Sequence, residues 1–274
     1  MNLPAFYEDK VVLITGGSMG IGKEMARLVM DAGGKVILTG RRVSKLLAAG
    51  EEFREFADNL VLHTGDVADY QDTSVLMDKI TNKFGRLDIL VNNAGMAGYG
   101  EVGSLEPQAV DEVIDTNIKG SIFQTRAALP LIKKSKGSIL FVSSVAGFWG
   151  LPAYSLYSLS KMALTALVQS LRLENAKDGV YAGIAYVCFT ENEKEKRWLS
   201  PEGNRDPLPQ RNKLFLTSRS DTARKMLVQI ARRKPTDVHS GIGKLMYIMS
   251  RFIPGIVNWI LIQFYKRQKK PGFL

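Results

Sequence analysis

Two residues of the sequence, Tyr157 and Lys161, have types and a spacing that suit acid–base chemistry. Residues four apart on a helix lie on one face, so a phenol and an ammonium at these positions can act on one substrate atom. A phenol titrates at about pH 10, and a neighbouring positive charge favours its ionised form. The same pair also occurs on ordinary surface helices. Its chemistry therefore depends on the elements that position it.

A glycine-rich turn near the start of the chain lies between a predicted strand and a predicted helix. Residues 10–15 are rich in β-branched residues, as in a buried parallel strand, and residues 23–32 have the apolar spacing of a helix. Between them, Gly16 permits a tight turn, Gly20 permits close approach of the backbone to a pyrophosphate, and Gly22 permits close helix packing. The helix N-terminus adds free amides and a positive dipole end. The pattern predicts a dinucleotide site, with a purely structural turn as the alternative.

The end of the second predicted strand, residues 35–39, indicates which dinucleotide is bound. NAD-binding proteins usually place a carboxylate here against the ribose 2′-hydroxyl, but this sequence has Gly40, Arg41 and Arg42. Two guanidiniums suit a 2′-phosphate in charge and in geometry, so we predict NADP(H) as the cofactor. The alternative is that both arginines belong to a solvated helix start.

Polar residues also follow the next two predicted strands. Asp66 follows a third apolar run, where its carboxylate can bind the adenine amino group. A fourth strand, residues 87–91, ends in Asn92, Asn93 and then Gly95. Open α/β sheets bind ligands at the carboxyl ends of their strands, so these residues extend the predicted cofactor site.

In order and spacing these motifs resemble the short-chain dehydrogenase/reductase family, over roughly residues 8–195. The five motifs are Thr15-Gly16-x-x-x-Gly20-x-Gly22, Asn92-Asn93-Ala94-Gly95, Asn117 within Thr-Asn-Ile-Lys, Ser143-Ser144, and Tyr157-x-x-x-Lys161. Ser144 precedes Tyr157 at the spacing of the family's second serine. Tyr154 has a serine, not a lysine, four positions on, so it is assigned to the pocket or to packing.

The resemblance implies hydride transfer between nicotinamide C4 and a carbonyl or secondary alcohol. Tyr157 would protonate the developing alkoxide, and Ser144 would hydrogen-bond the substrate oxygen. Lys161 would hold the nicotinamide ribose, and Asn117 would position a water that relays protons to Lys161. Structural alternatives are a helix cap for Asn117 and a strand-end turn for Ser144.

The resemblance also implies a set of cofactor contacts. They are Gly16, Ser18, Met19, Gly20, Ile21, Gly22, Arg41, Arg42, Asp66, Val67, Asn93, Ala94, Gly95, Tyr157, Lys161 and Thr190. Near Thr190 the sequence departs from the family, which usually has Pro-Gly where this chain reads Val187-Cys188-Phe189. No metal is expected.

Length and composition indicate one α/β domain. The chain has 274 residues, 45% of them hydrophobic, without a linker or repeat that would mark a second domain. Together with the motifs this predicts a doubly wound parallel sheet, the Rossmann fold. We assign residues 1–240 to the NADP(H)-binding domain, with a polar substrate lid at about 191–219, and residues 241–274 to a C-terminal amphipathic extension.

Charge and the N-terminal residues bear on partners and location. The formal net charge of +10 is compatible with nucleic acid, an anionic membrane or an anionic cofactor. The basic residues are mostly dispersed and are not interleaved with aromatic residues, so we expect no nucleic-acid binding. The N-terminus lacks the pattern of a secretion signal, and the single cysteine, Cys188, cannot form an internal disulfide. We expect a cytoplasmic protein that forms a homodimer or homotetramer.

The segment 245–265 has apolar residues at helical spacing, followed by a basic run at 266–270. The apolar residues are Leu245, Ile248, Met249, Phe252, Ile256 and Trp259. Arg251, Pro254 and Asn258 interrupt the segment, which argues against a membrane span. We expect an interfacial helix on the cytoplasmic face of a membrane, with packing on the domain or on a partner subunit as the alternative.

This extension, with Tyr186 and with Gly95-Met96-Ala97, is similar to the branch that includes 3-ketodihydrosphingosine reductases. The likeness implies NADPH-dependent reduction of a long-chain ketolipid. Steroid or ketoacyl substrates, and a non-catalytic NADP(H)-binding module, are the alternatives. The intact set of four catalytic residue types favours an enzyme.

Overall fold

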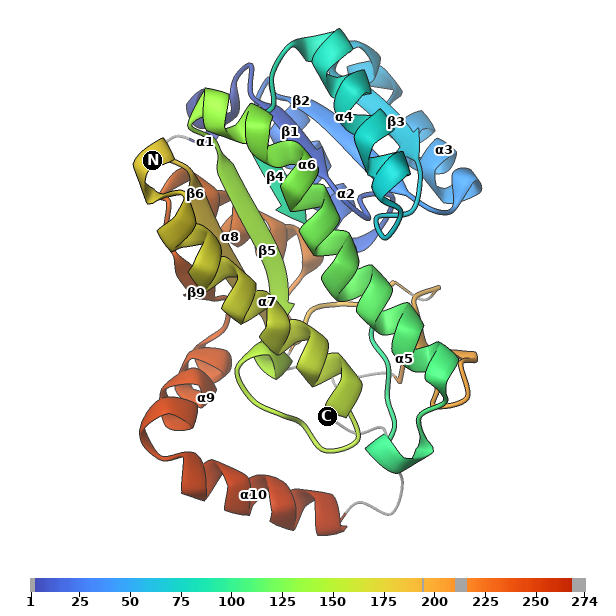
Figure 1. Cartoon of the computed structure of the whole chain (residues 1–274), viewed down its shortest axis with the longest axis vertical. Helices are drawn as coiled ribbons and strands as arrows, with labels where there is room; N and C mark the ends of the chain where they lie inside the picture. The colour runs from blue at the N-terminus through green and yellow to red at the C-terminus, as the bar shows by residue number, and fades with distance from the viewer. Residues whose placement is uncertain (1–2, 194, 210–215, 268–274) are drawn as a thin grey trace.

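The computed structural model describes residues 3–193, 195–209 and 216–267. Within these residues the chain forms a seven-stranded parallel sheet with helices on both faces (Figure 1). The strands are β1 (Val11–Ile14), β2 (Lys35–Gly40), β3 (Leu60–Thr64), β4 (Ile89–Asn92), β5 (Ser138–Ser144), β6 (Tyr181–Val187) and β9 (Thr236–Val238). The doubly wound parallel sheet predicted from the sequence is confirmed. The short seventh strand, β9, was not predicted.

The strand order places the functional loops at one edge of the sheet. The order is β3-β2-β1-β4-β5-β6-β9, so the chain passes from β3 at one edge back to β4 beside β1. The direction of winding therefore reverses between β1 and β4, which is where open α/β sheets bind ligands. All residues of β1 and β6 are buried, because helices cover both faces of a parallel sheet.

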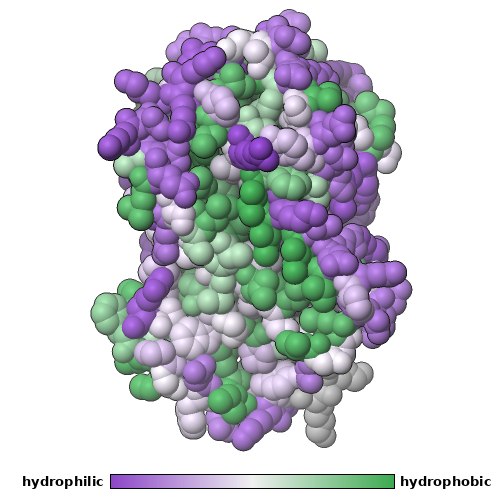
Figure 2. Space-filling view, in the orientation of Figure 1, coloured by the Kyte–Doolittle hydropathy of each residue, from purple (hydrophilic) through white to green (hydrophobic). Residues whose placement is uncertain are grey.

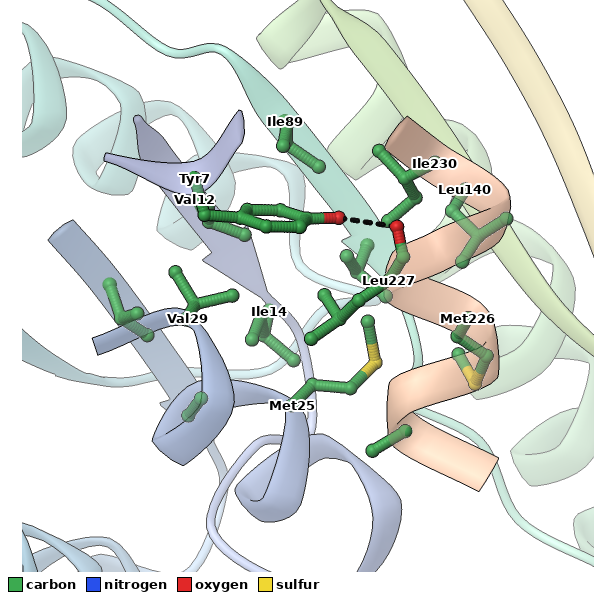
Figure 3. Close-up of a cluster of buried hydrophobic side chains, with 14 of the residues drawn as sticks. Tyr7, Val12, Ile14, Met25, Val29, Ile89, Leu140, Met226, Leu227 and Ile230 are labelled. Carbon is green, nitrogen blue, oxygen red and sulfur yellow. Dashed lines mark hydrogen bonds between the residues drawn. The ribbon is translucent and has the colours of Figure 1, made fainter. Parts of the chain in front are cut away.

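One face of the sheet is covered by α2 (Gly20–Met30), α3 (Val43–Glu52) and α8 (Arg219–Ala231) (Figure 1). Met25 from α2, Met226 from α8 and Ile14 of β1 belong to one buried core, shown in Figure 3. Tyr7 of α1 (Leu3–Tyr7) closes this core, and its hydroxyl donates to the carbonyl of Leu227 at 2.8 Å. The hydrogen bond satisfies the buried phenol, and burial raises the pKa of Tyr7.

The opposite face carries α4 (Tyr70–Phe84), α6 (Gly120–Ser135) and α7 (Ser155–Glu174). Their apolar sides pack on the second core, which includes Ile80, Ile132 and Val168. A preceding helix, α5 (Pro107–Ile114), continues through a π-helical turn, η3 (Asp115–Lys119), into α6. The first two turns of α7 lie at the carboxyl ends of the strands and carry Tyr157 and Lys161.

The predicted lid contains a two-stranded antiparallel hairpin of β7 (Arg197–Leu199) and β8 (Arg205–Pro207). It lies beside the loop that follows β4, since the amide of Leu199 donates to the carbonyl of Ala97 in that loop at 2.9 Å. Residues 194 and 210–215, also assigned to the lid, lie outside the described residues.

The C-terminal extension consists of two helices, α9 (Gly241–Phe252) and α10 (Pro254–Arg267), at the lower end of Figure 1. The single amphipathic helix predicted over 245–265 is therefore wrong. Proline fixes its own backbone and restricts the residue before it, so the helix ends before Pro254, with Ile253 at a non-helical φ of −134°. In the described part of the chain no single helix is long and apolar enough to cross a membrane, although these two helices pass that test as a pair bent by 118°.

Candidate active site

Helix α7 holds Tyr157 and Lys161 on one face beside the end of β5. The Lys161 ammonium lies 5.8 Å from the centroid of the Tyr157 ring and donates to the carbonyl of Val142 at 3.0 Å. Only 6% of Lys161 is exposed. Burial, together with a smaller effect from the charge of Lys196 in the lid, lowers the pKa of Lys161 to about 8. The phenol therefore has a buried ammonium as its neighbour.

Contacts with β5 and the following turn fix the first part of α7. The Ser143 hydroxyl donates to the carbonyl of Lys161 at 3.2 Å, and Thr165 donates to the carbonyl of Gly147 at 2.9 Å. A Cβ at Gly147 would lie 2.1 Å from the Ser143 hydroxyl oxygen, so only glycine fits there. Ser143 therefore supports the helix, which leaves Ser144 as the serine that reaches the site.

Ser144 is the last residue of β5 and is partly exposed at the carboxyl edge of the sheet. Its hydroxyl accepts a hydrogen bond from the amide of Ala146 at 3.3 Å. The strand-end turn that the sequence left open for Ser144 is thus present. Because the hydroxyl accepts in this bond, its proton can still be donated to a substrate oxygen.

Asn117 lies inside the π-helical turn η3 and is completely buried. Its side chain accepts from the amide of Met96 at 2.8 Å and donates to the carbonyl of the same residue at 2.9 Å. It also donates to the Ser160 hydroxyl at 2.9 Å. The helix-cap alternative for Asn117 is wrong. The π turn instead places the amide between α7 and the loop after β4, a use of π turns that is frequent at functional sites.

Gly95 keeps the space between Asn117 and Lys161 open. A Cβ at Gly95 would lie 3.2 Å from the Asn117 side-chain oxygen and 3.2 Å from the Lys161 amine. Any larger residue would press on both groups. This spacing is compatible with the predicted relay of protons from Asn117 to Lys161.

The turn after β1 has the shape of a cradle for a dinucleotide phosphate. Gly16 and Gly20 have φ angles of +60° and +61°, which favour glycine. A Cβ at Gly16 would lie 2.9 Å from Ala94 Cα, whereas a Cβ at Gly20 would meet no described atom within 4 Å. The backbone is thus closely packed behind Gly16 and open in front of Gly20, as the approach of a phosphate to the start of α2 requires. The turn fits the predicted cofactor.

Hydrogen bonds join this turn to the loop after β4. The Thr15 hydroxyl accepts from the amides of Asn93 at 3.0 Å and Ala94 at 2.9 Å. The Asn93 side chain donates to the carbonyl of Gly16 at 3.1 Å, and a Cβ at Gly22 would lie 2.6 Å from its nitrogen. The structure therefore brings together the residues of two motifs that are far apart in the sequence.

The ends of β2 and β3 form a charged cluster. An Arg41 guanidinium nitrogen lies 3.6 Å from an Asp66 carboxylate oxygen and 3.9 Å from Glu112. Arg42 donates to the Met19 sulfur at 2.7 Å, which places it beside the glycine turn. The two predicted arginines thus lie on either side of the end of β2.

The remaining predicted contacts lie along the same edge. Ile21 packs on the first core. Ser18 lies next to Gly40, because a Cβ added at Gly40 would lie 3.3 Å from the Ser18 hydroxyl oxygen. Val67 is buried against Gly120. Thr190 is buried after β6, with its hydroxyl 3.3 Å from that of Thr222.

The lid hairpin contributes Trp198 to an aromatic cluster with Tyr99 and Tyr154. The rings of Tyr99 and Trp198 lie 4.5 Å apart, and Tyr154 lies 6.0 Å from Trp198. Tyr99 donates to the Asp206 carboxylate at 2.6 Å, and burial with this bond raises the pKa of Tyr99 to about 12. Within the described residues no group of three or more His, Cys, Asp or Glu side chains could hold a metal ion.

The sequence reasoning missed residues that act through the lid and through packing. Gly147 and Ser160 position α7 and Asn117, as described above. Glu193 from the lid binds the amide of Gly20, and Arg219 of α8 binds the same carboxylate. No local pattern marks these residues, because their contacts depend on how the lid folds back on the sheet.

Comparison with known proteins gives a consistent result. A model of the short chain dehydrogenase family matches residues 10–200. An 11-beta-hydroxysteroid dehydrogenase 1A of Arabidopsis thaliana is 33% identical over 264 residues, which cover 91% of this chain and 74% of that protein. An uncharacterized oxidoreductase of Staphylococcus saprophyticus is 38% identical over 178 residues, 63% of this chain and 75% of that one.

Two solved structures share the fold. A short-chain dehydrogenase from Streptomyces avermitilis superposes with a TM-score of 0.78 at 21% identity, covering 95% of this chain and all of that one (100%). A short chain dehydrogenase/reductase from Burkholderia phymatum, solved in complex with NAD, gives a TM-score of 0.78 at 20% identity over 91% of this chain and 95% of that one.

Proposed function

The chain belongs to the short-chain dehydrogenase/reductase family, and on this premise we propose that it reduces a ketone of a hydrophobic, long-chain lipid with NADPH. As a member of this family it is an oxidoreductase that acts on CH–OH or C=O groups with a nicotinamide dinucleotide. One observation carries the proposal. Tyr157, Lys161, Ser144 and Asn117 converge at the carboxyl edge of the sheet, next to the glycine turn.

The proposed mechanism assigns a separate task to each of these residues. The bound nicotinamide would supply the hydride to the carbonyl carbon. Ser144 donates a hydrogen bond to the carbonyl oxygen, and Tyr157 gives its proton to that oxygen as negative charge develops. Lys161 stabilises the phenolate that remains, because its ammonium is held beside the ring. Asn117 holds the loop after β4 and would position the water that relays the replacement proton to Lys161.

The cofactor would be held by the elements at the same edge. The glycine turn and the start of α2 would receive the pyrophosphate, and Lys161 and Thr190 would bind the nicotinamide end. The choice of NADPH is supported by Arg41 and Arg42, which follow β2 directly. An NAD enzyme usually has a carboxylate at this point, which binds the ribose 2′-hydroxyl. Asp66, now 3.6 Å from Arg41, would contact the adenine.

Replacing Arg41 with Ala is expected to weaken NADPH binding about 10-fold and to leave NADH binding nearly unchanged. A guanidinium–phosphate contact is charge-assisted, and NADH has no phosphate at the 2′ position. Fluorescence titration of both reduced cofactors measures the effect. An equal loss for both cofactors would make Arg41 a structural residue, and a wild-type preference for NADH would refute the NADPH proposal.

A hydrophobic substrate is supported by the surroundings of the site. Tyr99, Trp198 and Tyr154 form an aromatic cluster between the loop after β4 and the lid hairpin. Tyr265 near the end of α10 donates to the Glu101 carboxylate, so α10 reaches from α9 to the same loop. A steroid is the second candidate, because the Arabidopsis relative carries the name of a hydroxysteroid dehydrogenase.

The function is tested by following NADPH oxidation with three ketones. These are a 3-keto long-chain sphingoid base, an 11-ketosteroid and a short, water-soluble ketone. We expect the long-chain ketone to have the highest kcat/KM. A steroid that exceeds it would favour the second candidate. If none of the ketones, nor other ketolipids and ketoacyl compounds, consumes NADPH, the chain is a non-catalytic binding module.

We also propose that α9 and α10 hold the protein on the cytoplasmic face of a membrane. Large apolar residues are exposed on both helices, among them Phe252 at 80% and Trp259 at 63%, and none of the residues of α10 is buried. Figure 2 shows hydrophobic side chains in the lower part of the view, where α9 lies. Lys266 and Arg267 add positive charge at the end of α10. The predicted basic residues Lys269 and Lys270 lie outside the described residues.

Vesicle sedimentation is expected to show salt-sensitive binding to anionic membranes. Each inserted large apolar side chain contributes about 1.5–3 kcal/mol, and each basic residue about 1 kcal/mol that salt screens. Replacing Phe252 and Trp259 with Gln should release most of the protein, and replacing Lys266, Arg267, Lys269 and Lys270 with Gln should release part of it.

The matched control for this experiment is Leu47→Gln, because Leu47 is 60% exposed on α3. This variant should sediment like the wild type. Activity on a short ketone should persist in all variants. Wild-type protein that stays in the supernatant at low salt would contradict the membrane proposal.

We further propose that the protein is a homodimer formed through α6 and α7. Ile122 of α6, and Leu159, Met162 and Leu173 of α7, are exposed by 39–82%. Figure 2 shows a hydrophobic area near its centre, in the part of the view where these helices lie. Light scattering should give at least twice the chain mass of 30.3 kDa, and Leu159→Glu should give the monomer. A monomeric wild type would contradict the proposal.

A further inference from the structure

The segment after Thr190 places a carboxylate at the start of α2. An oxygen of Glu193 accepts from the amide of Gly20 at 2.8 Å, and a guanidinium nitrogen of Arg219 donates to the same oxygen at 2.6 Å. Gly20 is the first residue of α2, and within the described residues the preceding Met19 gives no side-chain cap. Glu193 thus satisfies an amide that a helix N-terminus offers to anions.

A second carboxylate of the same segment lies near the basic residues that follow β2. Glu195 forms an ion pair with Lys45, in the first turn of α3. Lys45 lowers the pKa of the Glu195 carboxyl, and the charges of Arg42 and Arg197 contribute to a smaller extent. Glu195 therefore lies within the positive field that Arg41 and Arg42 are proposed to provide for a 2′-phosphate.

NADPH carries its negative charge on the diphosphate and on the 2′-phosphate. Glu193 lies at the glycine turn, where the diphosphate is proposed to bind, and Glu195 lies at Lys45, near the arginines proposed to bind the 2′-phosphate. An ordinary surface ion pair would not explain the amide of Gly20, which lies 173 residues away in the sequence and belongs to the phosphate turn. A phosphate oxygen and a carboxylate oxygen cannot occupy one amide together, so the lid and the cofactor compete for it.

We propose that Glu193 and Glu195 occupy the positions of the two cofactor phosphates before the cofactor binds. In this proposal Arg219 and Lys45 are phosphate-binding residues. Arg219 then exchanges the Glu193 carboxylate for the pyrophosphate, and Lys45 exchanges Glu195 for the 2′-phosphate. The exchange keeps both cations paired and frees the lid segment when the cofactor enters. The Lys45 assignment rests on the proposed use of NADPH, whereas the Arg219 assignment needs only a dinucleotide.

The test is fluorescence titration of NADPH and NADH with the full chain, without substrate. Arg219→Gln should weaken both cofactors about 10-fold, as for one hydrogen bond to a charged group, and Lys45→Gln should weaken NADPH alone. Glu193→Gln should tighten both cofactors about 3- to 10-fold, because the competitor is weakened. Glu195→Gln should tighten NADPH alone.

The matched control is Glu191→Gln, an exposed residue of the same segment with the same charge. It should change neither dissociation constant, which separates displacement from a general charge effect. Unchanged binding in Arg219→Gln, or weaker binding in Glu193→Gln, would overturn the proposal. If Arg219→Gln fails to fold, Glu193→Gln still decides the outcome, because it retains the arginine.

Failure of this inference and failure of the proposed function give different results. A wild-type preference for NADH would refute the NADPH proposal, while the responses of Arg219→Gln and Glu193→Gln would still test the pyrophosphate assignment. A selective loss of NADPH binding in Arg41→Ala, with no effect in the Arg219 and Glu193 variants, would uphold the proposed cofactor and overturn the lid exchange.

Discussion

Replacing Tyr157 with Phe is expected to lower turnover about 10²–10⁴-fold and to leave cofactor binding unchanged. The substitution removes only the hydroxyl that would protonate the developing alkoxide, and the ring still packs beside Lys161. Single-turnover reduction of the substrate ketone, together with NADPH fluorescence titration, separates the two effects.

The control for this variant is Tyr154→Phe, at the neighbouring tyrosine of the same segment. Tyr154 is buried against Trp198, and its loss of a hydroxyl should change turnover by less than about threefold. If Tyr157→Phe retained more than about a tenth of wild-type turnover, Tyr157 would not be the main proton donor. A large loss confined to Tyr154→Phe would transfer that role to Tyr154.

Replacing Lys161 with Met is expected to lower turnover by about 10²-fold or more and yet to stabilise the fold at pH 7. The phenolate of Tyr157 would lose its neighbouring positive charge, so in the direction of alcohol oxidation the rising limb of the pH–rate profile should move to higher pH. A profile that keeps its position would show that Lys161 does not assist the phenol.

The stability effect follows from the pKa of Lys161, which burial lowers to about 8 from an ordinary value of 10.5. Between these values the unfolded chain binds more protons than the folded one, so stability rises as pH rises from about 8 to 10.5. Below pH 8 the full cost of the buried charge remains, on the order of 3 kcal/mol. Loss of the hydrogen bond to Val142 offsets about 1 kcal/mol of the gain in the Met variant.

Urea unfolding of both proteins at pH 7 and pH 9.5 measures this effect. The free energy of unfolding of the wild type, relative to that of Lys161→Met, should increase with pH, because titrating groups away from Lys161 and Tyr157 contribute equally to both. If the variant were less stable than the wild type at pH 7, and the difference in stability were the same at pH 9.5, the buried charge at this position would not be costly.

Much of the fold could be predicted because local patterns specify it. The glycine turn, the β-branched strands and the ends of those strands are all encoded in short segments, and the rule for parallel sheets then brings the strand ends to one edge. Tyr157 and Lys161 could be found in the same way, since their spacing is that of one helix face, whereas Ser144 was assigned from the resemblance to the family's motif.

Other features depend on tertiary contacts that no short segment specifies. The π turn around Asn117 is stabilised by the backbone of Met96, and β9 has three residues that become a strand only by pairing with β6. The lid carboxylate of Glu193 contacts Gly20, which lies 173 residues earlier in the sequence. The break at Pro254 was visible in the sequence, but the 118° bend depends on how α9 packs through Tyr247 against Phe148.

The central claim is that a hydride passes from NADPH to a hydrophobic ketone at the site formed by Tyr157, Lys161, Ser144 and Asn117. The most direct measurement uses NADPH deuterated at C4 of the nicotinamide, in each of its two stereoisomers, with mass spectrometry of the alcohol formed from the long-chain ketone. We predict one deuterium at the carbinol carbon from one stereoisomer only. In Tyr157→Phe this deuterium should appear far more slowly. An alcohol without deuterium from either stereoisomer, or the same rate in Tyr157→Phe, would contradict the proposed site.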